Sequence, residues 1–150
     1  MIPKEVEDLF KPITIGDAEL SNRIMMAPMT TGFARDAMVT DQMINYYAER
    51  AKGGAGLIMV EMSIVDYPVG STVGSMMMSS DDDQYIPGLK RLANAIKKEG
   101  AHAMMELSHG GRYCHSSITG VPPVAPSPIR SRLPIFADMP RDLSPEQVEE

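Results

Sequence analysis

The chain has 150 residues, 43% of them hydrophobic and 23% charged, which is enough for one globular domain with a buried core. The net charge is −6 and no stretch is rich in lysine or arginine, which argues against binding to nucleic acid or to an anionic membrane. With a single cysteine, Cys114, the chain has neither an intrachain disulfide nor a CxxC metal or redox motif.

Targeting signals are the next feature. No apolar run approaches the roughly 20 residues needed to span a bilayer. The first ten residues, MIPKEVEDLF, carry charges where a signal peptide would have its apolar region. We therefore expect a soluble, cytoplasmic protein.

The first expected elements are strands. Residues 12–20 (PITIGDAEL) alternate apolar and polar side chains around a Gly-Asp turn signal, which predicts a small β-hairpin. Residues 24–27 (IMMA) form a short apolar run that stops at Pro28, and they predict a buried strand.

A helix and a second strand follow. Thr40 and Asp41 can cap a helix that Gly53 and Gly54 end. Its apolar stripe has helical spacing and comprises Met43, Ile44, Tyr47, Ala48 and Ala51. Residues 56–61 (GLIMVE) predict a second buried strand, and this strand ends in an acid.

The same pattern repeats after a long polar loop that runs through residues 79–84. A second helix ends before Gly100, and its inward-facing residues are expected to be Ile86, Leu89, Leu92, Ala93 and Ile96. Residues 101–107 (AHAMMEL) predict a third buried strand. Strands that alternate with amphipathic helices predict parallel βαβ units, with which both a doubly wound sheet and a (β/α)8 barrel begin.

The last quarter of the chain differs. Residues 122–136 (PPVAPSPIRSRLPIF) contain too many prolines to be regular structure throughout. Residues 144–147 (SPEQ) have the spacing of a capping box with proline in the first turn, which predicts the start of a helix. Three residues later comes Glu150, so the sequence looks as if it ends within an element.

Ligand sites in α/β folds gather where parallel strands end. The residues that follow the three strands are Ala27, Pro28, Met29 and Thr30, then Glu61, Met62 and Ser63, then Glu106 to Arg112. If the strands are adjacent, we expect these three ends to face one pocket.

Each residue in the third group (ELSHGGR) has two interpretations. Glu106 either hydrogen-bonds a ligand N–H group or pairs with Arg112 or a loop amide. His109 either acts in acid–base or anion chemistry or makes an ordinary loop hydrogen bond. The two glycines either admit a ligand close to the backbone or form a plain turn.

Two other site classes find little support in the sequence. HGGR resembles an oxyanion-hole loop of esterases, but the GxSxG nucleophile elbow that such enzymes require is absent. The spacing of His102, His109 and His115 matches no metal-binding pattern, so we expect no metal site.

Four longer segments carry a resemblance to a known family. Residues 9–30 (LFKPITIGDAELSNRIMMAPMT) resemble the opening of the Old Yellow Enzyme family of flavin oxidoreductases, and residues 46–61 resemble its first helix and second strand. MMELSHGGRY, residues 104–113, is similar to its third-strand motif. Residues 123–150 resemble the corresponding part of its 2,4-dienoyl-CoA reductase and enoate reductase branch.

This resemblance implies a fold and a cofactor. The family is a (β/α)8 TIM barrel that holds FMN at the carboxyl ends of its strands. Residues 1–150 would then be an incomplete barrel domain, an N-terminal part with three strands, two helices and the preceding hairpin. A complete barrel typically needs about 250 residues.

Six residues match positions that contact the flavin in the family. The resemblance implies that Ala27, Pro28, Met29 and Thr30 lie against the flavin ring, with Thr30 near its O4 and N5 atoms. It implies that the backbone of Met62 touches the flavin and that Glu106 lies at the pyrimidine edge of the ring.

Two of these matches depart from the family pattern. Met62 is bulkier than the usual alanine or glycine. Glu106 replaces a glutamine, and an ionised carboxylate accepts a hydrogen bond but cannot donate one to a flavin carbonyl. Its negative charge would also oppose the anionic form of the reduced flavin.

The activity implied is an ene-reductase reaction, in which hydride passes from NADH or NADPH through FMN to the activated C=C bond of an enone or enoyl substrate. The family's catalytic side chains lie outside this chain, as do the iron–sulfur cysteines and FAD domain of its longer members. We expect the isolated chain to be inactive and to associate with itself or with a chain that completes the barrel. The alternative is a non-catalytic remnant that serves as an interaction module.

Overall fold

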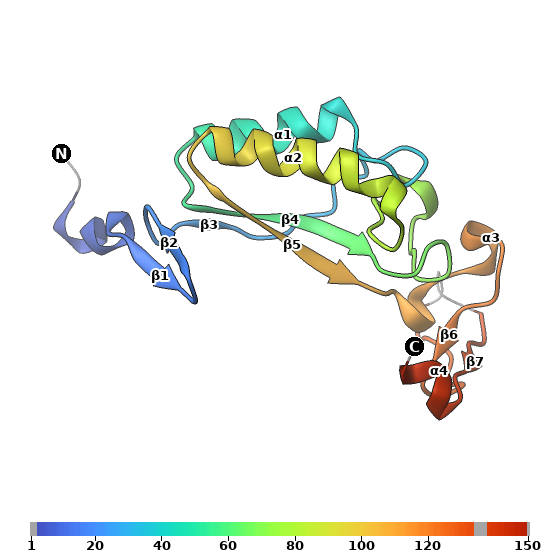
Figure 1. The fold of residues 1–150 in the computed structure, drawn as a ribbon. Helices are drawn as coiled ribbons and strands as arrows, with labels where there is room; N and C mark the ends of the chain where they lie inside the picture. The colour runs from blue at the N-terminus through green and yellow to red at the C-terminus, as the bar shows by residue number, and fades with distance from the viewer. Residues whose placement is uncertain (1–2, 134–137, 150) are drawn as a thin grey trace.

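The computed structural model describes residues 3–133 and 138–149, and its central feature is a parallel sheet with two helices on one face (Figure 1). The strands are β1 (Ile13–Ile15), β2 (Ala18–Leu20), β3 (Met25–Met26), β4 (Leu57–Ile64), β5 (His102–Ser108), β6 (Val124–Ala125) and β7 (Arg141–Asp142). The α-helices are α1 (Asp41–Lys52), α2 (Ile86–Lys98), α3 (Ser116–Thr119) and α4 (Pro145–Glu149). Short 3-10 helices lie at Lys4–Phe10, Gly74–Met76, Asp83–Tyr85 and Gly111–Tyr113.

The central sheet confirms the predicted βαβαβ order. Its strands lie in the order β3-β4-β5, and both pairs are parallel. β3 has only two residues, and β4 continues to Ile64, three residues beyond its predicted end. The β4–β5 register shifts between Val60 and Ser63, so β4 carries an irregularity where the predicted strand was to end.

The hydrophobic core lies between this sheet and the two helices. Of the two predicted capping residues, Thr40 is the cap of α1, because its Oγ1 accepts a hydrogen bond from the N–H of Met43 at 3.3 Å, and Asp41 is the first residue of the helix. The buried core cluster comprises Ala34, Met43, Tyr47, Ala51, Ile58, Val60, Met78, Leu92, Ile96 and Ala101. Most residues of the predicted helical stripes therefore pack in or against this core. Ala48 and Ala93 are half-buried outside the cluster, and one residue is a clear exception.

Ile86 is that exception, because its side chain is 53% exposed. It is the first residue of α2, and the preceding Tyr85, only 7% exposed, takes the buried place at this end of the helix. The prediction that Ile86 faces inward is wrong.

The two ends of the chain form smaller units. β1 and β2 make the predicted hairpin, which lies beyond the amino end of the central sheet (Figure 1). At the other end β6 pairs in parallel with β7. The predicted capping box is confirmed, since Ser144 Oγ accepts from the N–H of Gln147 and Gln147 Oε1 accepts from the N–H of Ser144. Of the proline-rich stretch 122–136, residues 134–136 lie outside the described residues.

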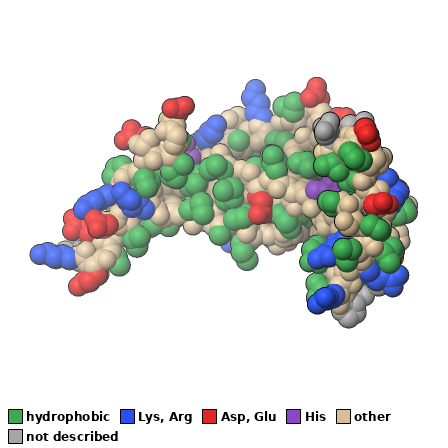
Figure 2. Space-filling view, turned by 90° about the horizontal axis from the view of Figure 1, so that it is seen from below, with side chains coloured by type: hydrophobic (Ala, Val, Ile, Leu, Met, Phe, Trp, Pro, Cys, Tyr) green, Lys and Arg blue, Asp and Glu red, His purple; other side chains and the backbone are tan. Residues whose placement is uncertain are grey.

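The second face of the central sheet is not covered by a helix within the described residues. Met26, Ala103 and Met105 pack toward the helices, so Met25 and Met104 point to the opposite face, because successive residues of a strand alternate. Met25 is 51% exposed and Met104 is 49% exposed. Apolar side chains gather along this side of the molecule (Figure 2). None of the described helices is long and apolar enough to cross a membrane.

Candidate functional site

Residues 27–30 follow β3 at the carboxyl edge of the sheet. Ala27, Met29 and Thr30 are exposed and Pro28 is half-buried. Outside the sheet ladder, none of the four forms a hydrogen bond with another described residue. Their backbone groups and the Thr30 hydroxyl are therefore free to meet a ligand.

Glu106 and Met62 lie on the uncovered face of the sheet. Glu106 and Ser108 share the face of Met104, because every second residue of a strand points the same way. Ser108 Oγ donates to Met62 Sδ at 3.3 Å, which places Met62 beside them. Glu106 is half-buried and has no hydrogen bond or ion pair with a described residue. The pairing of Glu106 with Arg112 is therefore not formed.

Glu61 has a different environment, although it lies on β4 next to Met62. Its side chain is 0% exposed. Its Oε2 accepts hydrogen bonds from the N–H of Thr31 at 2.8 Å and from the hydroxyl of Tyr47 at 3.1 Å. The backbone N–H of Glu61 donates to the same Tyr47 oxygen at 2.9 Å. Its Oε1 has no partner among the described residues.

Burial keeps the Tyr47 hydroxyl protonated. Tyr47 is 0% exposed, and burial raises the pKa of its hydroxyl far above the usual 10, with the Glu61 carboxylate adding to the rise. Tyr47 therefore stays neutral and able to donate over the whole range of ordinary pH. We call Glu61, Tyr47 and the Thr31 amide the Glu61 node.

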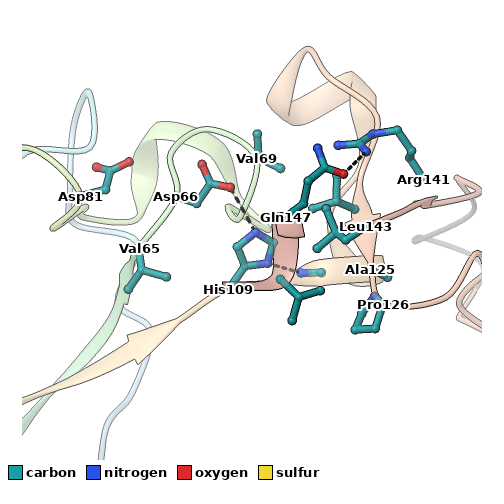
Figure 3. A pocket seen from close by; sticks show the side chains of 13 residues that line it. Val65, Asp66, Val69, Asp81, His109, Ala125, Pro126, Arg141, Leu143 and Gln147 are labelled. Atoms are coloured by element: carbon teal, nitrogen blue, oxygen red, sulfur yellow. Dashed lines mark hydrogen bonds and ion pairs between the residues drawn. The ribbon is translucent and has the colours of Figure 1, made fainter. Parts of the chain in front are cut away.

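A cavity of about 910 Å³ lies beyond the carboxyl ends of β4 and β5 (Figure 3). Both polar and apolar side chains line it, among them Val65, Asp66, His109, Arg141 and Leu143. None of the six residues that match flavin-contact positions lines it. Of the three predicted strand-end groups, only the third contributes to this cavity, through His109 and Gly111. One pocket shared by all three strand ends stays a prediction.

His109 is held firmly in this cavity. Its Nδ1 accepts from the N–H of Gly111 at 3.0 Å, so in the neutral ring the proton lies on Nε2, 3.5 Å from Asp66 Oδ2. A Cβ atom on Gly70 would lie 2.8 Å from the imidazole Cδ2, which shows how closely the ring packs. Both ring nitrogens of His109 are thus engaged, as in the loop hydrogen-bonding interpretation.

Sequence reasoning missed the Glu61 node. It placed Tyr47 in an apolar stripe and Glu61 at a strand end but did not connect them. The available signal was a polar hydroxyl on the buried face of a helix and an acid in an apolar strand, because each needs a partner when buried.

Comparisons with known proteins identify one matching family and several relatives. Residues 8–150 match the family described as NADH:flavin oxidoreductase / NADH oxidase. The chain is 47% identical over 142 residues to a metal reductase of Desulforamulus reducens and 41% identical over 145 residues to an NADH oxidase of Thermoanaerobacter brockii. In both cases 95% of this chain is covered, but only 20% and 22% of the relatives' own lengths.

Solved structures with a similar fold come from related proteins. The chain is similar to a 2-naphthoyl-CoA reductase in complex with 2-naphthoyl-CoA, with a TM-score of 0.88 and 31% identity over 95% of this chain and 23% of that one. It is also similar to an Old Yellow Enzyme homologue from Zymomonas mobilis, with a TM-score of 0.83 and 31% identity over 95% of this chain and 41% of that one.

Proposed function

Because the chain belongs to the NADH:flavin oxidoreductase family, as its resemblance to Old Yellow Enzymes implied, we propose that it forms the first strands of an FMN-dependent ene-reductase barrel. Its fold is a fragment, about 20–40%, of the TIM-barrel structures of this family. In this proposal residues 1–150 are part of one flavin domain, and further barrel strands complete the site.

The main structural support for this proposal is the free polar surface at the ends of β3 and β5. The exposed backbone of residues 27–30, the Thr30 hydroxyl and the unpaired carboxylate of Glu106 suit the edge of a planar heterocycle that both donates and accepts hydrogen bonds. When bound, FMN would supply hydride transfer between a nicotinamide and a C=C bond. The residues of this chain would bind and orient the ring, and Glu106 would accept from a ring N–H.

The proposed substrate, hydride donor and additional cofactors rest on the similar proteins. We propose an enone or enoyl substrate, since one similar structure contains a CoA thioester, and either NADH or NADPH as donor. The relatives, of which this chain covers 20% and 22%, leave room for 4Fe-4S and FAD elsewhere in a longer polypeptide. A cytoplasmic location remains part of the same proposal.

An FMN titration of the purified chain tests the proposal. Flavin absorbance and fluorescence report binding, and light scattering reports the mass of the binding species. Saturable binding by a defined species would support a flavin site to which this chain contributes. A folded, monodisperse chain that fails to bind FMN, alone or with a barrel-completing polypeptide, would contradict it.

Substitution of Glu106 tests the assignment of the ring edge. In the FMN-binding protein, Glu106→Gln should bind FMN about threefold to tenfold more tightly, because the amide can donate to a ring carbonyl and carries no charge. Glu99→Gln is the matched control, since it removes the same charge from an exposed position before β5. Equal effects of the two substitutions would contradict a contact between Glu106 and the flavin.

One observation favours the alternative of a non-catalytic interaction module. The central sheet has an uncovered apolar face and unpaired edges on β3 and β5 within the described residues. A chain that binds a partner protein through this face and never binds FMN would fit that alternative.

A further inference from the structure

The first residue firmly anchored after β3 is Thr31. Residues 27–30 have no hydrogen bond to a described residue outside the sheet ladder, whereas the Thr31 N–H donates to Glu61 Oε2 at 2.8 Å. The Thr31 hydroxyl in turn accepts from the N–H of Phe33 at 3.2 Å. The position of Thr30 therefore depends directly on where Glu61 holds its neighbour.

Glu61 reaches Thr31 because of the irregularity in β4. Val60 packs in the core against the helices, and in a regular strand the next residue would point to the opposite face. The register shift between Val60 and Ser63 allows Glu61 also to point toward α1, where it meets Tyr47. A strand irregularity thus re-aims a carboxylate from the uncovered face into the core.

Burying the Glu61 carboxyl group costs free energy, which indicates that its side chain does more than fill the core. A fully buried carboxylate is expensive unless it is hydrogen-bonded, and one of its oxygens, Oε1, has no partner among the described residues. An apolar side chain at position 61 would fill the core without this cost but could not hold the Thr31 amide. The hydrogen bonds of the Glu61 side chain therefore serve to hold the Thr31 amide in place.

We propose that the Glu61 node is a positioning device for the cofactor: it fixes the segment 27–31 so that Thr30 and the preceding backbone meet the flavin ring in one geometry. Tyr47 orients the carboxylate, Glu61 holds the Thr31 amide, and neither residue touches the flavin. This inference rests on the proposed function, because it assigns the node's purpose to flavin binding by residues 27–30.

The test compares Tyr47→Phe with Tyr46→Phe in the purified full-length protein. Tyr46 is the adjacent aromatic residue on α1, half-buried and edge-on to Phe33 and Tyr47. Its hydroxyl forms no hydrogen bond with a described residue, so its removal leaves the hydrogen bonds of the node intact. Two properties are measured: hydrogen exchange of the Thr31 amide, and the dissociation constant and absorbance spectrum of FMN.

We expect Tyr47→Phe to speed exchange at Thr31 and to weaken FMN binding about fivefold to tenfold, with a shifted flavin spectrum, as for the loss of one hydrogen bond. Tyr46→Phe should leave both within about twofold. Glu61→Gln keeps one acceptor and should fall between the wild-type protein and Glu61→Ala.

Three outcomes would overturn the inference. Unchanged Thr31 exchange in Tyr47→Phe would show that the node does not hold this segment. Faster exchange with unchanged FMN affinity and spectrum would show that the node stabilises the fold without positioning the flavin. If the wild-type protein binds no FMN while Tyr47→Phe still speeds exchange, the proposed function fails first, and the node is then structural only.

Discussion

At the scale of single residues, two carboxylates end neighbouring apolar runs and have opposite environments. Glu61 is fully buried and holds two donors, whereas Glu106 is half-buried and has no partner among the described residues. In the sequence both look alike, as GLIMVE and AHAMMEL. The difference arises from the register shift in β4, so a strand-end acid has to be assigned from its strand pairing.

Cys114 leads to a prediction about pH. Its side chain is 0% exposed, and burial raises the pKa of the thiol from 9.0 to about 11. The folded state therefore keeps its proton where the unfolded state loses it. The thiol's contribution to stability is fully present below about pH 9 and is lost as the pH rises toward 11, up to about 2 kcal/mol.

Urea unfolding of the wild-type protein and of Cys114→Ala, under reducing conditions between pH 7 and 10.5, measures this effect. Cys114→Ala should be less stable at pH 7, because it leaves a small cavity, but its stability should fall less steeply above pH 9. The cavity cost is the same at every pH, so parallel pH profiles would contradict a raised thiol pKa.

At the scale of elements, the cap of α1 is the clearest prediction. Thr40 Oγ1 accepts from the N–H of Met43 and donates to the carbonyl of Phe33 at 2.7 Å, so it joins the helix to the segment that follows β3. Thr40→Ala should lower the free energy of unfolding by about 1–2 kcal/mol, measured by urea unfolding. Thr40→Ser keeps the hydroxyl and should cost less than about 0.5 kcal/mol. A similar loss in both variants would implicate the threonine methyl group instead.

The elements that the sequence predicted correctly have strong local signals. α1 has a capping threonine and a helical apolar stripe, and the hairpin has a Gly-Asp turn between alternating residues. β4 and β5 are continuous apolar runs, which predict strands buried on both faces of a parallel sheet. That burial is confirmed for β4, but it is wrong for β3 and β5, which have no buried residue because one face of the sheet is uncovered within the described residues. The family resemblance then selected the barrel over the doubly wound sheet.

The features that could not be predicted from the sequence depend on contacts between distant residues. β4 extends past Glu61 because Ser63 and Ile64 pair with the end of β5. The polar residues Glu61 and Ser63 interrupt the apolar run and hide this continuation in the sequence. β6 and β7 are two residues each and pair across a proline-rich segment, with no periodicity to reveal them. Likewise, the carboxylate-to-hydroxyl contact of the Glu61 node joins residues 14 positions apart in different elements.

At the scale of the whole molecule, the uncovered sheet predicts self-association of the isolated chain. β5 lies at an edge of the central sheet and carries Leu107, which is 64% exposed. Unpaired strand edges beside apolar surface are templates for pairing with another chain. We expect the mean mass in light scattering to rise with protein concentration.

Two substitutions, one on the sheet edge and one away from it, test which surface is responsible for the self-association. Leu107→Lys should reduce the association, because a charge on an edge strand opposes strand pairing. Ile86→Lys is the control, since Ile86 is 53% exposed on α2, outside the sheet. Equal effects of the two substitutions, or a monomer at all concentrations, would contradict association through this edge.

The core cluster has a consequence for how the protein is made. All its members lie between Ala34 and Ala101, and Met105 on β5 is the last residue that packs against it, so this core contains no residue from the segments that follow β5. Ribosomes add roughly 5–20 residues each second, and N-terminal units fold first. The core is therefore able to collapse during translation, once the residues through Ser108, the end of β5, have left the exit tunnel. Later segments would then be assembled onto a scaffold that already exists.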